Sequence, residues 1–119
     1  MATVYKNAQV QGTASTGTYA TLYTTTSASS TTSAVISSIV VTNTSSTAAL
    51  YRVGIMATAG TPAAANWVVY DATVQGNDTV CLTLGITLPA GASGTANNFI
   101  RVSSSANTVT FSAYVSEIS

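Results

Sequence analysis

The stretch TVCLTLGITL, residues 79–88, alternates between two kinds of side chain along its whole length. One side carries Val80, Leu82, Leu84, Ile86 and Leu88, and the other carries Thr79, Cys81, Thr83, Gly85 and Thr87. Successive side chains of a β-strand point to opposite faces, so this pattern predicts a strand with one buried face and one open face. The preceding QGND, residues 75–78, has the composition of a tight turn and predicts the entry to that strand.

Similar segments recur along the chain. AVISSIVVTN (34–43) is rich in β-branched residues and apolar on both faces, as is typical of a strand covered on two sides. WVVYDATV (67–74) and TVTFSAYV (108–115) are further strand candidates, while TPAAANW (61–67) has room for a single helical turn. Clusters of Gly, Pro, Asn and Ser separate the strands at intervals of about 8–12 residues. We therefore predict one all-β domain, a single antiparallel β-sandwich or jelly roll of about six to eight short strands.

The N-terminal part is the least regular. TTTSASSTTS (24–33) is polar and of low complexity, which is typical of a loop or an arm. We predict an irregular N-terminal arm with one or two edge strands over residues 1–32, within the same domain, and the sandwich core over residues 33–119. Neither a secretion signal nor a membrane span is expected, because no apolar run is long enough.

The scarcity of charge is the most unusual property of the composition. Charged residues make up 5% of the chain, against a usual value of about 25%. The net charge is zero, while Ser and Thr supply about a third of the residues. Near-zero net charge favours association, so we expect much of the surface to face protein partners. Three basic residues are too few for a nucleic-acid footprint, and no nucleic-acid or membrane partner is predicted.

The sequence offers no set of residues for catalysis, metal binding or cofactor binding. There is no histidine and a single cysteine, Cys81, which excludes a zinc set and a serine triad. Asp71 and Asp78 flank one turn and a glycosidase-like pair is conceivable, but Asp78 is better explained by turn-forming bonds to its own backbone. We predict a protein that is not an enzyme, with no catalytic residue, no metal and no cofactor.

Aromatic and isolated charged residues are the best candidates for contacts with partners, because aromatic residues and Arg often anchor interfaces. The candidate interface residues are Tyr19, Tyr23, Arg52, Trp67, Tyr70 and Arg101. A different interpretation remains open: aromatic residues on one sheet form a platform for sugars, and a carbohydrate-binding module would use Tyr51, Trp67, Tyr70 and Tyr114.

Two segments, SAVISSIVVTNTSSTAALYRVGI (33–55) and YDATVQGNDTVCLTLGITL (70–88), resemble a family of small virion structural proteins encoded by tailed bacteriophages, of the type that infects cyanobacteria and other aquatic bacteria. The resemblance extends to Leu22–Thr24 and Ser116–Ile118 and covers about four fifths of the chain. Two loops, TTSASSTTS (25–33) and PAGASGTANN (89–98), are longer than in the family pattern.

The resemblance implies a β-sandwich of the virion, made in the host cytoplasm and carried on the particle surface. It implies a capsid decoration or cement protein that binds the major capsid protein as a homo-oligomer, by analogy a trimer, with an arm that orders on binding. A component of the tail, neck or fibre attachment is the alternative within the same class, and a module that binds host-surface glycans is the alternative from another class.

Overall fold

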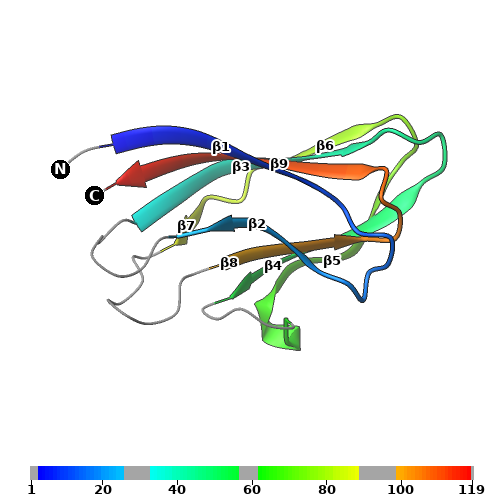
Figure 1. Ribbon diagram of the computed structural model, residues 1–119, viewed down its shortest axis with the longest axis horizontal. Coiled ribbons are helices and arrows are strands. Elements are labelled where there is room, and N and C mark those ends of the chain that lie inside the picture. Colours follow the sequence, from blue (N-terminus) through cyan, green and yellow to red (C-terminus); the bar gives the residue numbers. More distant parts are fainter. Residues whose placement is uncertain (1–2, 26–32, 57–61, 89–98, 119) are drawn as a thin grey trace.

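The structure is a computed structural model that describes residues 3–25, 33–56, 62–88 and 99–118. The predicted loop at 89–98 and most of the predicted loop or arm at 24–33 lie outside the described residues. Two antiparallel sheets face each other, as Figure 1 shows, which confirms the predicted all-β sandwich. The elements are β1 (Thr3–Gln11), β2 (Ala20–Thr24), β3 (Ser33–Asn43), β4 (Ala49–Met56), η1 (Ala64–Asn66), β5 (Trp67–Val74), β6 (Thr79–Leu82), β7 (Ile86–Leu88), β8 (Phe99–Ser104) and β9 (Val109–Ile118). No helix in these ranges has the length and apolar character to cross a membrane.

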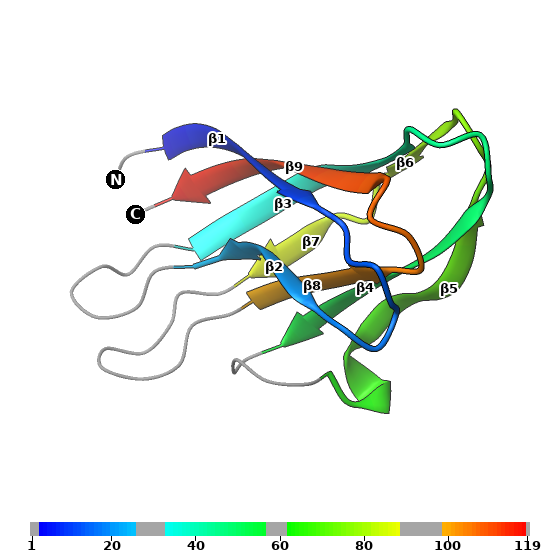
Figure 2. The ribbon, with the colours of Figure 1, turned by 45° about the vertical axis from the view of Figure 1, so that its right-hand side comes forward.

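The strand order is that of a jelly roll. The larger sheet runs β1-β9-β3-β6, with β7 also paired to β3, and the smaller sheet runs β2-β8-β4-β5. If β6 and β7 are taken as two halves of one strand, the eight strands form two four-stranded layers, as in a double-sheet jelly roll. The turned view in Figure 2 shows how the chain crosses from one layer to the other between β1 and β2.

The strand expected over residues 79–88 is interrupted. Leu82 pairs with Ile39 and Ile86 pairs with Ile36, so three residues on one side face two on the other. Gly85 adopts a left-handed φ of 61° in this interval, and Leu84 is exposed instead of buried. A β-bulge at Ser37 of β3 lies opposite the break and changes which residues of β3 face inward. One face of β3 is buried and the other is only partly buried, which differs from the prediction of a strand covered on two sides.

The N-terminal region is more regular than its composition indicates. Thr3–Gln11 forms a nine-residue strand paired along its length with β9, and Ala20–Thr24 pairs with β8. Both lie at sheet edges, as expected for residues 1–32. The sequence pattern is weak here because Thr3–Asn7 is exposed on both faces and has no core to match.

The inner faces of the two sheets form one apolar core. Its largest fully buried side chains come from β3, β7, β8 and β9, among them Phe111, Ile36, Ile39, Leu88 and Ile100. Tyr51 of the smaller sheet meets Phe111 of the larger sheet edge-on, with ring centroids 6.3 Å apart. This contact joins the layers, and burial raises the pKa of Tyr51.

A buried amide closes one end of the core. Asn43, at the end of β3, donates through Nδ2 to the carbonyl oxygens of Thr47 (2.8 Å) and Val74 (3.4 Å). Its Oδ1 accepts from the backbone N–H of Ser45 (3.0 Å) and the hydroxyl of Thr108 (3.2 Å). One side chain thereby satisfies polar groups of three chain segments where the sheets end.

Replacing Asn43 with Ala is expected to lower the free energy of unfolding by about 1–3 kcal/mol, because buried backbone groups lose their partners. Urea unfolding followed by circular dichroism measures the change. The matched control is Asn7→Ala on the exposed part of β1, with an expected change within about 0.5 kcal/mol. Equal effects of the two substitutions would contradict this role of Asn43.

Candidate functional site

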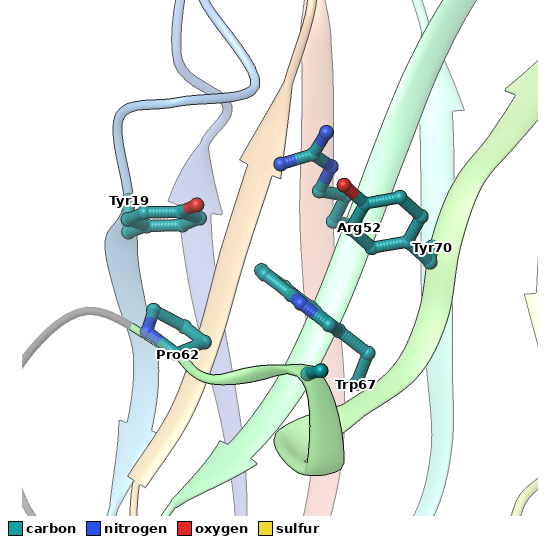
Figure 3. A pocket seen from close by; sticks show the side chains of 6 residues that line it. Tyr19, Arg52, Pro62, Trp67 and Tyr70 are labelled. Atoms are coloured by element: carbon teal, nitrogen blue, oxygen red, sulfur yellow. The ribbon is translucent and has the colours of Figure 1, made fainter.

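Four of the six candidate interface residues gather in one pocket on the outer face of the smaller sheet. Tyr19 precedes β2, Arg52 lies on β4, and Trp67 and Tyr70 lie on β5. Figure 3 shows their side chains around a shared space. The pocket has a volume of about 470 Å³, and Pro62 and Ala64 complete its lining.

An irregularity in β5 brings Tyr70 and Asp71 to the same arginine. Tyr51 pairs with Ala72 and Val53 pairs with Val69, so two residues of β5 lie opposite Arg52 alone. Asp71 takes a left-handed φ of 53° at this bulge, a conformation that Asp tolerates better than most residues. In a regular strand Tyr70 and Asp71 would point to opposite faces, so the bulge is what allows both to contact Arg52.

Arg52 is held on several sides. Its Nε and Nη2 donate to the two carboxylate oxygens of Asp71 at 2.6 and 3.2 Å, and Nη1 donates to the carbonyl of Thr16 at 3.2 Å. The guanidinium carbon lies 4.1 Å from the centroid of the Tyr70 ring and 5.6 Å from that of Trp67, within cation–π range. The hydrogen bonds from Arg52 hold the pKa of Asp71 below its ordinary value. The charged pair is therefore mutually satisfied.

The three aromatic rings form one continuous patch. Ring centroids are 5.7 Å apart for Tyr19 and Trp67 and 5.5 Å apart for Trp67 and Tyr70. Trp67 lies over Gly54, its partner on β4: a Cβ at Gly54 would come within 3.2 Å of the indole Cε3. The absence of a side chain at Gly54 lets the indole pack close to the sheet.

Tyr23 and Arg101 lie outside this pocket. A bulge at Leu22 turns Tyr23 inward, where it is 8% exposed, so it offers a partner little surface in the isolated chain. Its hydroxyl donates to Glu117, whose other carboxylate oxygen lies 3.0 Å from Lys6 Nζ. Arg101 donates to the hydroxyl of Thr21 at 2.9 Å, and its buried Nε has no partner among the described residues.

The four aromatic residues considered as a sugar platform separate into three places. Trp67 and Tyr70 are together in the pocket, Tyr51 is in the core, and Tyr114 is on the outer face of the larger sheet. Tyr19, which belongs to the patch, was not part of that set. Its position depends on the chain crossing between sheets, for which the sequence carries no periodic signal.

The two acidic residues considered for catalysis have separate structural partners. Asp71 pairs with Arg52, and Asp78 accepts the backbone N–H of Thr79 at 2.8 Å in the turn before β6. The turn explanation of Asp78 is confirmed. That the chain is not an enzyme stays a prediction.

The outer face of the larger sheet differs in charge from the smaller sheet, which carries Arg52, Asp71 and Arg101. Strand pairing places Tyr5, Asn7, Gln9, Val35, Ser38, Val40, Thr42, Thr79, Cys81, Thr87, Thr110, Ser112, Tyr114 and Ser116 on this face. None of these residues is charged. We call this set the uncharged face. Cys81 is exposed on it, on the Thr side of its strand as the sequence pattern indicated.

Replacing Gly54 with Ala is expected to shift the tryptophan fluorescence to longer wavelength, because the new methyl group lifts the indole of Trp67 away from the sheet into water. Trp67 is the chain's single tryptophan, so the emission spectrum reports this ring alone. Gly17→Ala is the control, since a Cβ there meets only the Ser15 hydroxyl at an ordinary 3.7 Å. An unchanged Gly54→Ala spectrum would show that the ring does not depend on the glycine.

Replacing Glu117 with Gln is expected to weaken the loss of stability in acid. Burial alone would raise the pKa of Glu117, but hydrogen bonds from Tyr23 and Lys6 and the charge of Lys6 outweigh it and hold the pKa below its ordinary value of 4.5. A lowered pKa stabilises the folded state above about pH 4.5, and this contribution is lost as the pH falls. Urea unfolding repeated at steps of about one pH unit between pH 3 and pH 7 measures how the free energy of unfolding changes with pH. Part of the pH dependence is expected to remain in the variant, because the pKa of Asp71 is also lowered. Identical pH dependence for the wild type and Glu117→Gln would contradict the role of Glu117.

Comparison with known proteins identifies the fold. No protein-family model matches the sequence, and no curated protein matches it either. A chain in the structure of the infectious bursal disease virus Gx strain superposes with a TM-score of 0.56 at 14% identity, over 99% of this chain and 33% of that chain. A chain of the T13 particle of the same virus gives 0.55 at 13% identity, over 98% and 31%. The chain spans about a third of the length of these chains, and at this identity the likeness shows a shared sandwich fold.

Proposed function

We propose that the chain is a non-enzymatic structural component of a virus particle, and specifically a capsid decoration or cement protein. The observation that carries the proposal is the uncharged face, a complete sheet surface of hydroxyl, amide, aromatic and aliphatic groups. Interface cores are depleted of charged residues, whereas a freely soluble domain usually keeps charges of both signs spread over its surface.

The edge strand β1 supports a partner on the same side of the molecule. Among the described strands, β1 pairs only with β9, and its other edge is open. Tyr5 is 81% exposed, and the only charged residue of the strand, Lys6, is neutralised by Glu117. An open edge can accept a strand from a neighbouring protein.

The fold and the sequence resemblance agree with this proposal. Jelly rolls occur in viral capsid and lectin domains, and the two superposed chains described above come from structures of one virus. The resemblance to the tailed-phage family adds the finer part: placement on the head, the major capsid protein as partner and a homo-oligomeric state. A tail or neck location is the alternative within this class.

The N-terminal region serves the proposed interface as a folded strand. Residues 1–30 include β1 and β2, and β2 supplies Leu22 and Tyr23 to the core. Removing them would expose the core, so a deletion of residues 1–30 is not expected to leave a folded sandwich. Point substitutions on the uncharged face test the interface without this cost.

The test is gold labelling of purified particles with an antibody to this chain. Particles that lack the protein are incubated with the wild type, and electron microscopy locates the label. Label spread over the head is the expected result. Label confined to the tail would replace the decoration role with the tail alternative, and particles without label would overturn the proposal.

A matched pair of charge substitutions then identifies the binding face. Tyr114→Lys places a charge on the uncharged face at a position that is 44% exposed, and Val68→Lys places one on the smaller sheet at a position that is 42% exposed. We expect Tyr114→Lys to weaken particle binding by roughly tenfold or more and Val68→Lys to leave it unchanged. The reverse result would place the interface on the smaller sheet.

A further inference from the structure

The aromatic pocket has no part in the proposed contact with the particle, since it opens on the other sheet from the uncharged face. Six residues from the β2 entry, β4, β5 and the segment around η1 line it. Its volume of about 470 Å³ lies within the range of sites for small ligands. The uncharged face and the pocket are thus two separate surfaces, and the pocket needs its own explanation.

The charge of the pocket points to a neutral ligand. Arg52 is the only charged residue in the lining, and its Nε and Nη2 are both bound by the carboxylate of Asp71. The face of the guanidinium is covered by the Tyr70 ring. An ionic ligand would have to compete with this pair, so the pocket presents no free charge of either sign.

The lining groups match one face of a sugar ring. Tyr19, Trp67 and Tyr70 offer aromatic surface, and Pro62 and Ala64 add aliphatic surface. The negative face of an aromatic ring attracts the weakly positive C–H bonds that lie on one side of a pyranose. Within the described part of the chain, no hydrogen bond uses the indole N–H of Trp67 or the hydroxyl of Tyr70, so both can bond to sugar hydroxyls.

The compactness of the patch favours a single ring over a proline-rich peptide. Neighbouring ring centroids are at most 5.7 Å apart, so the three rings make one patch. A polyproline segment rises about 3.1 Å per residue with three residues per turn, and it needs a row of successive aromatic grooves. The described residues show one such patch on this sheet.

The pocket is also organised before any ligand arrives. The two bulges in β5, the left-handed Asp71 and the close packing of Trp67 on Gly54 hold the aromatic residues in place. Strained backbone of this kind persists where surrounding contacts enforce it and is frequent at binding sites. We propose that the pocket of Tyr19, Arg52, Trp67 and Tyr70 binds a neutral pyranose by stacking its C–H face on the aromatic patch.

The test is saturation-transfer-difference NMR of the full chain with glucose, galactose, mannose and N-acetylglucosamine. We expect transfer to the ring C–H protons of at least one sugar and a concentration-dependent change in Trp67 fluorescence. Trp67→Phe is expected to weaken binding about tenfold or more, and Trp67→Ala to abolish the transfer. Tyr114→Ala, a tyrosine on the other sheet, is the matched control and is expected to bind normally.

Three results would overturn the proposal: no transfer from any of the four sugars, transfer that survives Trp67→Ala, or binding of a proline-rich decapeptide (roughly three polyproline turns) in place of sugar. Circular dichroism of each variant shows that its fold is intact. Particle labelling with Trp67→Ala separates the two functions, because that variant is expected to label particles as the wild type does. A wild type that labels particles but binds no sugar would overturn this inference alone. A wild type that binds sugar but does not label particles would overturn only the proposed function.

Discussion

The pairing of β3 with β9 is the constraint on which the rest of the structure depends. These strands are paired over ten positions at the centre of the larger sheet, β1 adds to the free side of β9, and β6 and β7 add to the free side of β3. Their inner residues, including Ile36, Ile39, Phe111 and Val115, supply most of one wall of the core. Because the paired segments are distant in sequence, the core forms only when both halves of the chain come together.

Four bulges adapt this regular framework in the described strands. The bulge at Ser37 changes the inward set of β3 and lies opposite the break between β6 and β7. The bulge at Leu22 turns Tyr23 into the core while Tyr19 stays on the outer face. In β5, the bulge opposite Arg52 gathers Tyr70 and Asp71 beside one guanidinium, and a second bulge at Val68 puts Trp67 on the same face as Tyr70. Each adds one residue to a strand, and each redirects the side chains that follow.

The two outer faces differ in chemistry, and we propose a different kind of contact for each. The larger sheet is uncharged and broad, with an open edge at β1. The smaller sheet carries the Arg52–Asp71 pair, Arg101 and the aromatic pocket. A protein partner on the larger sheet would leave the pocket open to solvent. A decoration protein with this arrangement would present its pocket outward from the particle.

Local alternation of apolar and polar residues was enough to predict the all-β class, the turn at residues 75–78 and the inward residues Val80, Leu82, Ile86 and Leu88, because each depends on near neighbours in the chain. Composition likewise indicated a surface poor in charge. The pocket could not be predicted in this way. Regular alternation separates Trp67 from Tyr70 and keeps Tyr19 and Tyr23 together, and the structure does the reverse at both places. Bulges arise from pairing with strands remote in sequence, so the position of these aromatic residues is a property of the folded sheets and not of any one segment.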